Sequence, residues 1–313
     1  MLSPLARTLS SAALLVLFAA GCGGAEPETP DDPSLPLKVV ATTTQVADFA
    51  RNLGGDRVTV HQLLRPNVDP HDYEPSPADM QAIAEADVLV KNGVGLEKWL
   101  DDTVRAAGFD GRVVDASQGV PVRGGDEEEG AGDPHIWHNP LNVKTMAATI
   151  GKAFAAADPA DAAAYQANLA EYDAKLDALD AEIARKIGSI PADRRKLVTN
   201  HDAFGYYLDR YKLTFVGSII PSFDTSAELS AKQVSDLVAE IRATGTVAIF
   251  SEASLPPKTA EAIGREAGVT VVAGEDALYG DSLGPEGSAG ATYLQMEEHN
   301  TDTIVNALRG TST

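Results

Sequence analysis

Three of the six histidines in the chain, His71, His135 and His201, stand in loops where a predicted strand or turn has just ended. A fourth loop carries Asp281. Three imidazole nitrogens and one carboxylate form a donor set that suits Zn²⁺ well and Mn²⁺ acceptably, whereas Ca²⁺ and Mg²⁺ require mostly oxygen ligands. The residue types therefore indicate a site for a divalent transition-metal ion.

Each of these residues belongs to a distinctive short motif. A single histidine is more often structural than a ligand, so the surrounding residues decide the interpretation. Prolines on both sides of His71 restrict the backbone of its loop, and Trp137 can pack beneath His135. His201 lies between a predicted strand and a predicted helix, and Asp281 follows a glycine. Loops that present a side chain with little conformational freedom favour a ligand role.

The remaining histidines are better explained by structural roles. His61 lies in a predicted strand and His299 on a predicted helix. His138 is near enough in sequence to His135 to support the site or to replace a ligand. Glu252 directly follows a predicted strand and could orient His201 through its second ring nitrogen, although packing between lobes is the alternative role.

Beyond residue 37, short β-branched runs alternate with helical patterns, which is typical of βαβ units. The sequence predicts an α/β fold of two small lobes, each with a parallel-type sheet and flanking helices. The predicted strands are 38–41, 57–60, 88–90, 197–199, 215–216, 247–250 and 269–272. The predicted helices are 46–53, 78–86, 204–211, 234–242, 260–267 and 293–308.

A long helix is predicted between the two lobes. Asp158 could cap it, Pro159 suits its first position and Gly188 suits its end. An apolar stripe with helical spacing predicts that one face is buried and that the helix is a rigid connector, with a coiled-coil partner helix as the alternative. The stripe consists of Tyr165, Leu169, Tyr172, Leu176, Leu179, Ile183 and Ile187.

The first residues carry an export signal. An apolar stretch from Ala12 to Ala20 follows Arg7 and is too short to cross a bilayer, which takes about 20 residues. The segment Ala19 to Cys22 resembles the bacterial lipobox and predicts a lipid anchor on Cys22; a secreted protein with a free thiol is the alternative. As the only cysteine, it excludes a disulfide framework and a thiolate metal cluster.

These patterns predict five parts of the chain. They are a lipoprotein signal peptide (1–21), a tether (22–36), an N-terminal α/β lobe (37–152), a linking helix (153–189) and a C-terminal α/β lobe (190–313). The formal net charge of −21 argues against nucleic acid as a partner, because Lys and Arg must neutralise phosphates there. The acidic segment 124–130 could collect cations, but a solvated flexible loop is the preferred interpretation.

The four motifs, in this order, after a lipobox and around a long middle helix, resemble the zinc and manganese solute-binding proteins of ATP-driven importers over essentially the whole mature chain. The resemblance implies that His71, His135, His201 and Asp281 bind the ion between two lobes. It also implies a monomer on the outer face of the cell membrane that delivers the ion to a permease with its ATPase.

The resemblance favours zinc, with manganese as the alternative. A histidine at the position of His201 is similar to the zinc-specific members, while many manganese-specific members carry glutamate there. One departure weakens the zinc assignment slightly. Many zinc-importing relatives have a long histidine-rich loop before the motif of His135, and the segment 124–130 here contains no histidine.

Two other functions fit part of the sequence pattern. A metallohydrolase would use three histidines and an open fourth position, but Asp281 as a fourth ligand leaves no place for an activated water, and no His-Glu-x-x-His motif is present. A surface adhesin lipoprotein with a structural metal is the second alternative. The sequence therefore predicts a metal-capturing protein that is not an enzyme.

Overall fold

The computed structural model describes residues 35–124, 132–227 and 229–309. The predicted signal peptide, Cys22, most of the tether and most of the acidic segment 124–130 lie outside these described residues. Within the described ranges, no helix is both long enough and apolar enough to cross a membrane.

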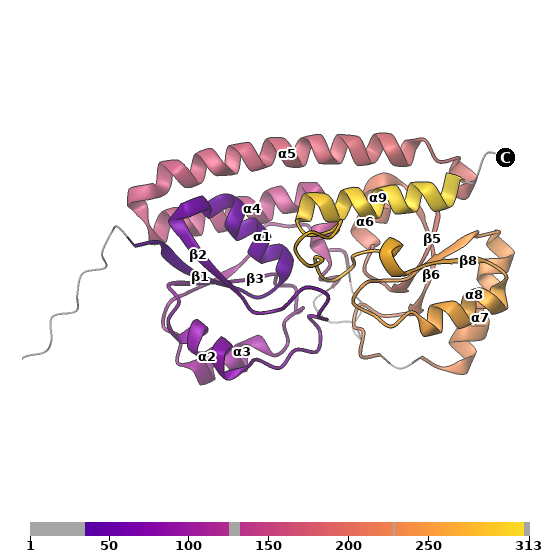
Figure 1. Cartoon of the computed structure of the whole chain (residues 1–313), viewed down its shortest axis with the longest axis horizontal. Helices are drawn as coiled ribbons and strands as arrows, with labels where there is room; N and C mark the ends of the chain where they lie inside the picture. Colours follow the sequence, from indigo (N-terminus) through magenta and orange to yellow (C-terminus); the bar gives the residue numbers. More distant parts are fainter. Residues whose placement is uncertain (1–34, 125–131, 228, 310–313) are drawn as a thin grey trace, which may run out of the picture. The chain divides into compact units, whose positions relative to one another are not determined.

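The first lobe is built on a four-stranded parallel sheet with the order β2-β1-β3-β4 (Figure 1). Side chains alternate between its two faces, so Val39 packs with α1 and α4 while Val40 packs with α2 and α3. The elements are β1 (Leu37–Ala41), α1 (Thr44–Gly54), β2 (Val58–Gln62), α2 (Pro77–Ala84), β3 (Val88–Lys91), α3 (Leu100–Ala107), β4 (Arg112–Asp115) and α4 (Pro140–Ala157).

The second lobe also alternates parallel strands with helices, but its strands do not form one four-stranded sheet. Its strands form two parallel pairs, β5 with β6 and β7 with β8, and β5 lies beside β7. Val198 and Ile249 pack with α7 and α8, whereas Leu197 and Phe250 join the larger core shared with the first lobe. The elements are β5 (Lys196–His201), α6 (Gly205–Tyr211), β6 (Thr214–Ile220), α7 (Ala231–Thr244), β7 (Ala248–Phe250), α8 (Lys258–Ala267), β8 (Thr270–Val272) and α9 (Tyr293–Arg309).

The long helix α5 (Ala162–Gly188) runs along both lobes (Figure 1). It packs on α1 and α4 of the first lobe and on α6 and α9 of the second. The predicted apolar stripe is buried, except that Leu169 is partly buried. The prediction of an α/β fold with two lobes joined by a long helix is thus confirmed.

The start of the helix differs from the prediction. The structure ends α4 at Ala157, so residues 153–157 belong to that helix, and Pro159–Asp161 form a single 3₁₀ turn before α5. The carboxylate of Asp158 makes no capping bond; it accepts a hydrogen bond of 2.8 Å from the hydroxyl of Tyr165. Proline suits the first turn of either helix type, which explains why the pattern placed the boundary here.

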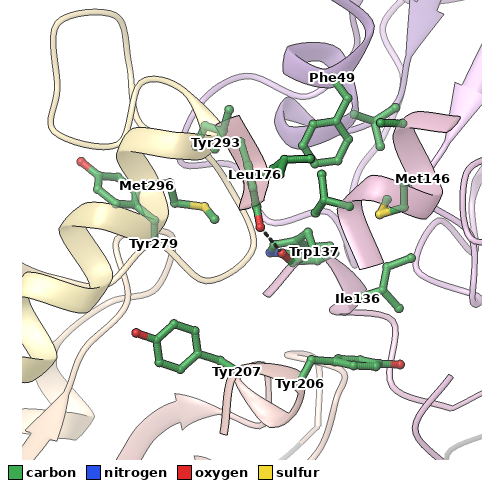
Figure 2. Packing of buried hydrophobic residues seen from close by; sticks show 14 of the residues in the cluster. Phe49, Ile136, Trp137, Met146, Leu176, Tyr206, Tyr207, Tyr279, Tyr293 and Met296 are labelled. Atoms are coloured by element: carbon green, nitrogen blue, oxygen red, sulfur yellow. Dashed lines mark hydrogen bonds between the residues drawn. The ribbon is translucent and has the colours of Figure 1, made fainter. Parts of the chain in front are cut away.

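Trp137 lies at the centre of the shared core (Figure 2). Its side chain is fully buried among residues of several elements, including Phe49, Leu176 and Tyr293. The hydroxyl of Tyr293 donates a hydrogen bond of 2.7 Å to the carbonyl of Trp137. The loop that carries His135 is therefore anchored in the buried core that the two lobes share.

Candidate metal centre

Four segments bring the predicted ligands together between the two lobes. His71 lies in the loop after β2, His135 precedes the 3₁₀ turn Ile136–His138, and His201 is the last residue of β5. Asp281 lies in the segment between β8 and α9. One donor atom from each of the four lies within 4.8 Å of all the others.

The separations between these atoms suit a single small ion. The Nε2 atoms of His135 and His201 are 3.2 Å apart. Asp281 approaches them with Oδ1 at 3.3 Å from His135 Nε2 and Oδ2 at 3.2 Å from His201 Nε2, and Oδ2 is 3.7 Å from His71 Nε2. Ligands about 2.0–2.1 Å from zinc at tetrahedral angles would lie about 3.3 Å from one another.

The cluster is buried and incompletely hydrogen-bonded. The side chains of His135, His201 and Asp281 are 0% exposed, and that of His71 is 3% exposed. Within the described residues, His71 Nε2 and both carboxylate oxygens of Asp281 have no hydrogen-bond partner. A buried carboxylate without a partner is costly, and a bound cation would remove that cost. The donor set therefore fits a transition-metal ion.

Burial and the neighbouring charges shift the pKa values of the candidate ligands, and the two histidines His135 and His71 shift in opposite directions. Burial lowers the pKa of His135, but the hydrogen bond with Asp133 and the nearby negative charge of Asp281 outweigh it and raise that pKa to about 9. For His71, burial prevails over the attraction of Asp281 and lowers the pKa to about 4. Burial raises the pKa of Asp281, yet His201 and His135 bring it well below its usual value. A metal ion must consequently displace protons from this cluster.

His135 is oriented by a carboxylate in its own loop. Asp133 Oδ1 lies 2.8 Å from His135 Nδ1 and accepts a hydrogen bond of 3.0 Å from its backbone N–H. Arg123 donates from Nη1 to the other oxygen of Asp133 at 2.8 Å. The hydroxyl of Tyr206 donates to the carbonyl of Asp133 at 2.8 Å. With Nδ1 engaged in this way, Nε2 is directed at the cluster.

His201 is oriented by Glu252 in the same manner. A carboxylate oxygen of Glu252 lies 3.0 Å from His201 Nδ1, and Oε1 also accepts a hydrogen bond of 3.0 Å from the backbone N–H of His201. Glu252 therefore occupies the place that the sequence hypothesis assigned to it. Asp133 was not singled out from the sequence, although an acidic residue two positions before a ligand histidine was the available signal.

His138 supports the segment that carries Asp281. Its Nδ1 lies 2.9 Å from Glu297 Oε1, and its Nε2 lies 3.1 Å from the carbonyl oxygen of Gly280. Trp137 donates to the same carbonyl at 3.0 Å. With both ring nitrogens engaged, His138 is placed to hold a ligand in position rather than to be one. A Cβ atom at Gly280 would lie 2.1 Å from Glu252 Oε2, so a side chain there would displace that carboxylate.

The other two histidines lie in separate contacts. His61 Nε2 is 3.2 Å from Asp79 Oδ1, and His299 Nε2 is 3.0 Å from the carbonyl oxygen of Ala277. Neither belongs to the four-residue cluster. The structure thus brings together all four residues that the motifs indicated.

Comparison with known proteins gives consistent matches. Residues 39–307 match the family described as "Zinc-uptake complex component A periplasmic" (ZnuA). The manganese-binding lipoprotein MntA of Halalkalibacterium halodurans is 32% identical, with 94% of this chain and 96% of the relative covered. The manganese ABC transporter substrate-binding lipoprotein PsaA of Streptococcus pneumoniae is 31% identical, with 94% of this chain and 97% of the relative covered.

A solved structure shows the same architecture. The periplasmic zinc-binding protein TroA of Treponema pallidum superposes with a TM-score of 0.82 at 32% identity, with 88% of this chain and 100% of TroA covered. The fold, the site and these matches define a solute-binding protein of the type used by ABC transporters. Within that class, the chain belongs to the ZnuA family.

Proposed function

We propose that this protein captures Zn²⁺, with Mn²⁺ as the alternative cargo, between its two lobes. The observation that carries the proposal is the buried cluster of His71, His135, His201 and Asp281, whose donor atoms lie within 4.8 Å of one another. The loaded protein, a monomer held on the outer face of the membrane by a lipid on Cys22, delivers the ion to a permease and its ATPase. The names of the relatives as ABC transporter substrate-binding lipoproteins support this role.

The choice between the two metals rests on the donor set. Three imidazole nitrogens and one carboxylate suit zinc, and a histidine at the position of His201 resembles the zinc-specific members of the family. The printed names of relatives point both ways, with manganese named for MntA and PsaA and zinc for TroA. Elemental analysis of the purified protein, followed by competitive titration with both metals, decides between them.

Alanine substitution tests the site. His71→Ala, His135→Ala and His201→Ala are each expected to lower the affinity for zinc well over tenfold, because each removes one nitrogen from the ligand shell. Titration against chelators of graded affinity measures the loss. His61→Ala is the matched control, since it removes an imidazole outside the cluster. Affinities near that of the wild type in all three variants would refute the proposal.

A chelator experiment separates transport from the two other functions. A fourth protein ligand leaves no open position for an activated water, which disfavours a hydrolase. For a transported ion, removal by a chelator should leave the circular-dichroism spectrum and cooperative melting intact. Unfolding on removal would instead indicate a structural ion, as in the adhesin alternative.

A further inference from the structure

His71 differs from the other two histidines in how it is held. Within the described residues no carboxylate lies at hydrogen-bond distance from its Nδ1, whereas His135 and His201 each have one there. The contact that fixes His71 is made through the backbone instead. Its N–H donates a hydrogen bond of 2.9 Å to Asp69 Oδ1 in the same loop.

Asp69 is in turn held by the opposite lobe. The hydroxyl of Thr225 donates a hydrogen bond of 2.6 Å to Asp69 Oδ2. Thr225 lies between β6 and α7 of the second lobe, whereas Asp69 and His71 lie in the first. One carboxylate thus joins the backbone of a candidate ligand to a side chain across the interface.

The segment Pro221–Ala227, which carries Thr225, makes further contacts around the site. Phe223 lies edge-on to His135, with ring centroids 6.4 Å apart. Asp224 pairs with Lys98 of the first lobe at 2.5 Å, and its other oxygen accepts hydrogen bonds from the backbone and hydroxyl of Ser226. The segment is therefore an ordered turn that bridges the two lobes beside the cluster.

We infer that Thr225 is a positioning residue for His71, which it places from across the interface through Asp69. This inference rests on the proposed function, because it concerns how one of the four ligands is held. The hydrogen bond to a carboxylate is charge-assisted and therefore stronger than a neutral one. The exposed ion pair between Lys98 and Asp224 contributes little by comparison, since its lysine is 67% exposed.

The physical consequence concerns release of the ion. Thr225 contacts Asp69 only while the two lobes are together. The contact therefore stabilises His71 as a ligand of a bound ion and does not assist the first encounter with a free ion. Its loss should therefore raise the dissociation rate much more than it lowers the association rate. Partners of metal ligands commonly change affinity by about 10–100-fold, and a residue one step further away should change it by roughly three- to thirtyfold.

The experiment measures release of Zn²⁺ from the full-length protein to an excess of a chromophoric chelator in a stopped-flow instrument. Thr225→Val, which keeps the shape and removes the hydroxyl, is expected to release zinc roughly three to thirty times faster. Thr225→Ser keeps the donor and should restore the wild-type rate. Lys98→Gln is the control for a contact between the lobes that does not reach Asp69. It should change the release rate less than twofold, because an exposed ion pair contributes little free energy.

A double mutant separates positioning from a general structural effect. If Thr225 acts only through His71, then Thr225→Val should have no further effect on release when His71→Ala is already present. Equal release rates for wild type and Thr225→Val, or an undiminished effect in the His71→Ala background, would overturn the inference and leave the proposed function intact. A wild-type protein that binds neither Zn²⁺ nor Mn²⁺ would overturn both.

Discussion

The loops that carry His135 and His71 bring the same side chain to the same cluster in different ways. The His135 loop is buried, and its imidazole is bonded to Asp133, which is itself held by Arg123. The His71 loop consists mostly of exposed and partly buried residues, and its histidine is held through the backbone by Asp69. The His135 loop is fixed in the buried core, whereas the His71 loop is held by a partly buried contact with Thr225 of the opposite lobe.

This difference divides the site into a fixed part and an adjustable part. His201 is held by Glu252, and Asp281 follows a carbonyl that is bonded to both Trp137 and His138. Glu252, Trp137 and His138 are themselves buried, so His201 and Asp281 belong with His135 to the fixed part. A preformed set of three ligands can receive an ion with little reorganisation, and the fourth then governs its retention.

The comparison predicts the order of the alanine variants. His135→Ala should lower zinc affinity about ten times more than His71→Ala, because it removes a ligand that Asp133 already orients toward the cluster before the ion binds. Water can replace His71 more easily, since that side chain lies at the edge of the cluster with 3% of its surface exposed. Competition titrations with zinc chelators measure both values. Equal losses, or a larger loss for His71→Ala, would contradict the division into fixed and adjustable parts.

Removal of the orienting charge should have a smaller effect than removal of the ligand. Asp133→Asn keeps the size of the side chain but loses the charge that bonds Nδ1 of His135, so zinc affinity should fall about 10–100-fold. Glu252→Gln is the matched substitution beside His201, and it should lower zinc affinity by a similar factor. The same chelator titrations apply, with thermal melting to verify folding. If Asp133→Asn binds zinc like the wild type, the His135 loop does not owe its order to that carboxylate.

The four candidate ligands could be predicted from the sequence because each lies in a local motif, and the lobes because β-branched runs alternate with helical patterns. The helices α3 and α4 and the strand β4 were not predicted. In α4 the apolar contrast is weak, since alanines lie on its buried and exposed faces alike. The bond from Thr225 to Asp69 joins residues 156 positions apart, and no local pattern encodes it. Local sequence thus indicates the donors, and tertiary packing decides which of them are fixed.

A further predicted effect concerns pH and again separates the two histidines. The pKa of His135 is raised to about 9, because the hydrogen bond with Asp133 and the charge of Asp281 outweigh burial, so its imidazole carries a proton at pH 7 until the ion displaces it. Zinc affinity should therefore rise with pH up to about 9, by at most about tenfold per unit for each displaced proton. The pKa of His71 is lowered to about 4, chiefly by burial, so this histidine is already neutral and contributes no proton.

Calorimetric titration of zinc in buffers of different ionisation enthalpy counts these protons directly. His71→Ala should release as many protons at pH 7 as the wild type, because the missing imidazole carried none. Asp133→Asn should release fewer, since it removes one of the groups that raise the pKa of His135. The reverse pattern, with proton release lost in His71→Ala and kept in Asp133→Asn, would place the protonated histidine in the adjustable loop. In that case the charge of the cluster, and not only its geometry, would depend on contact between the lobes.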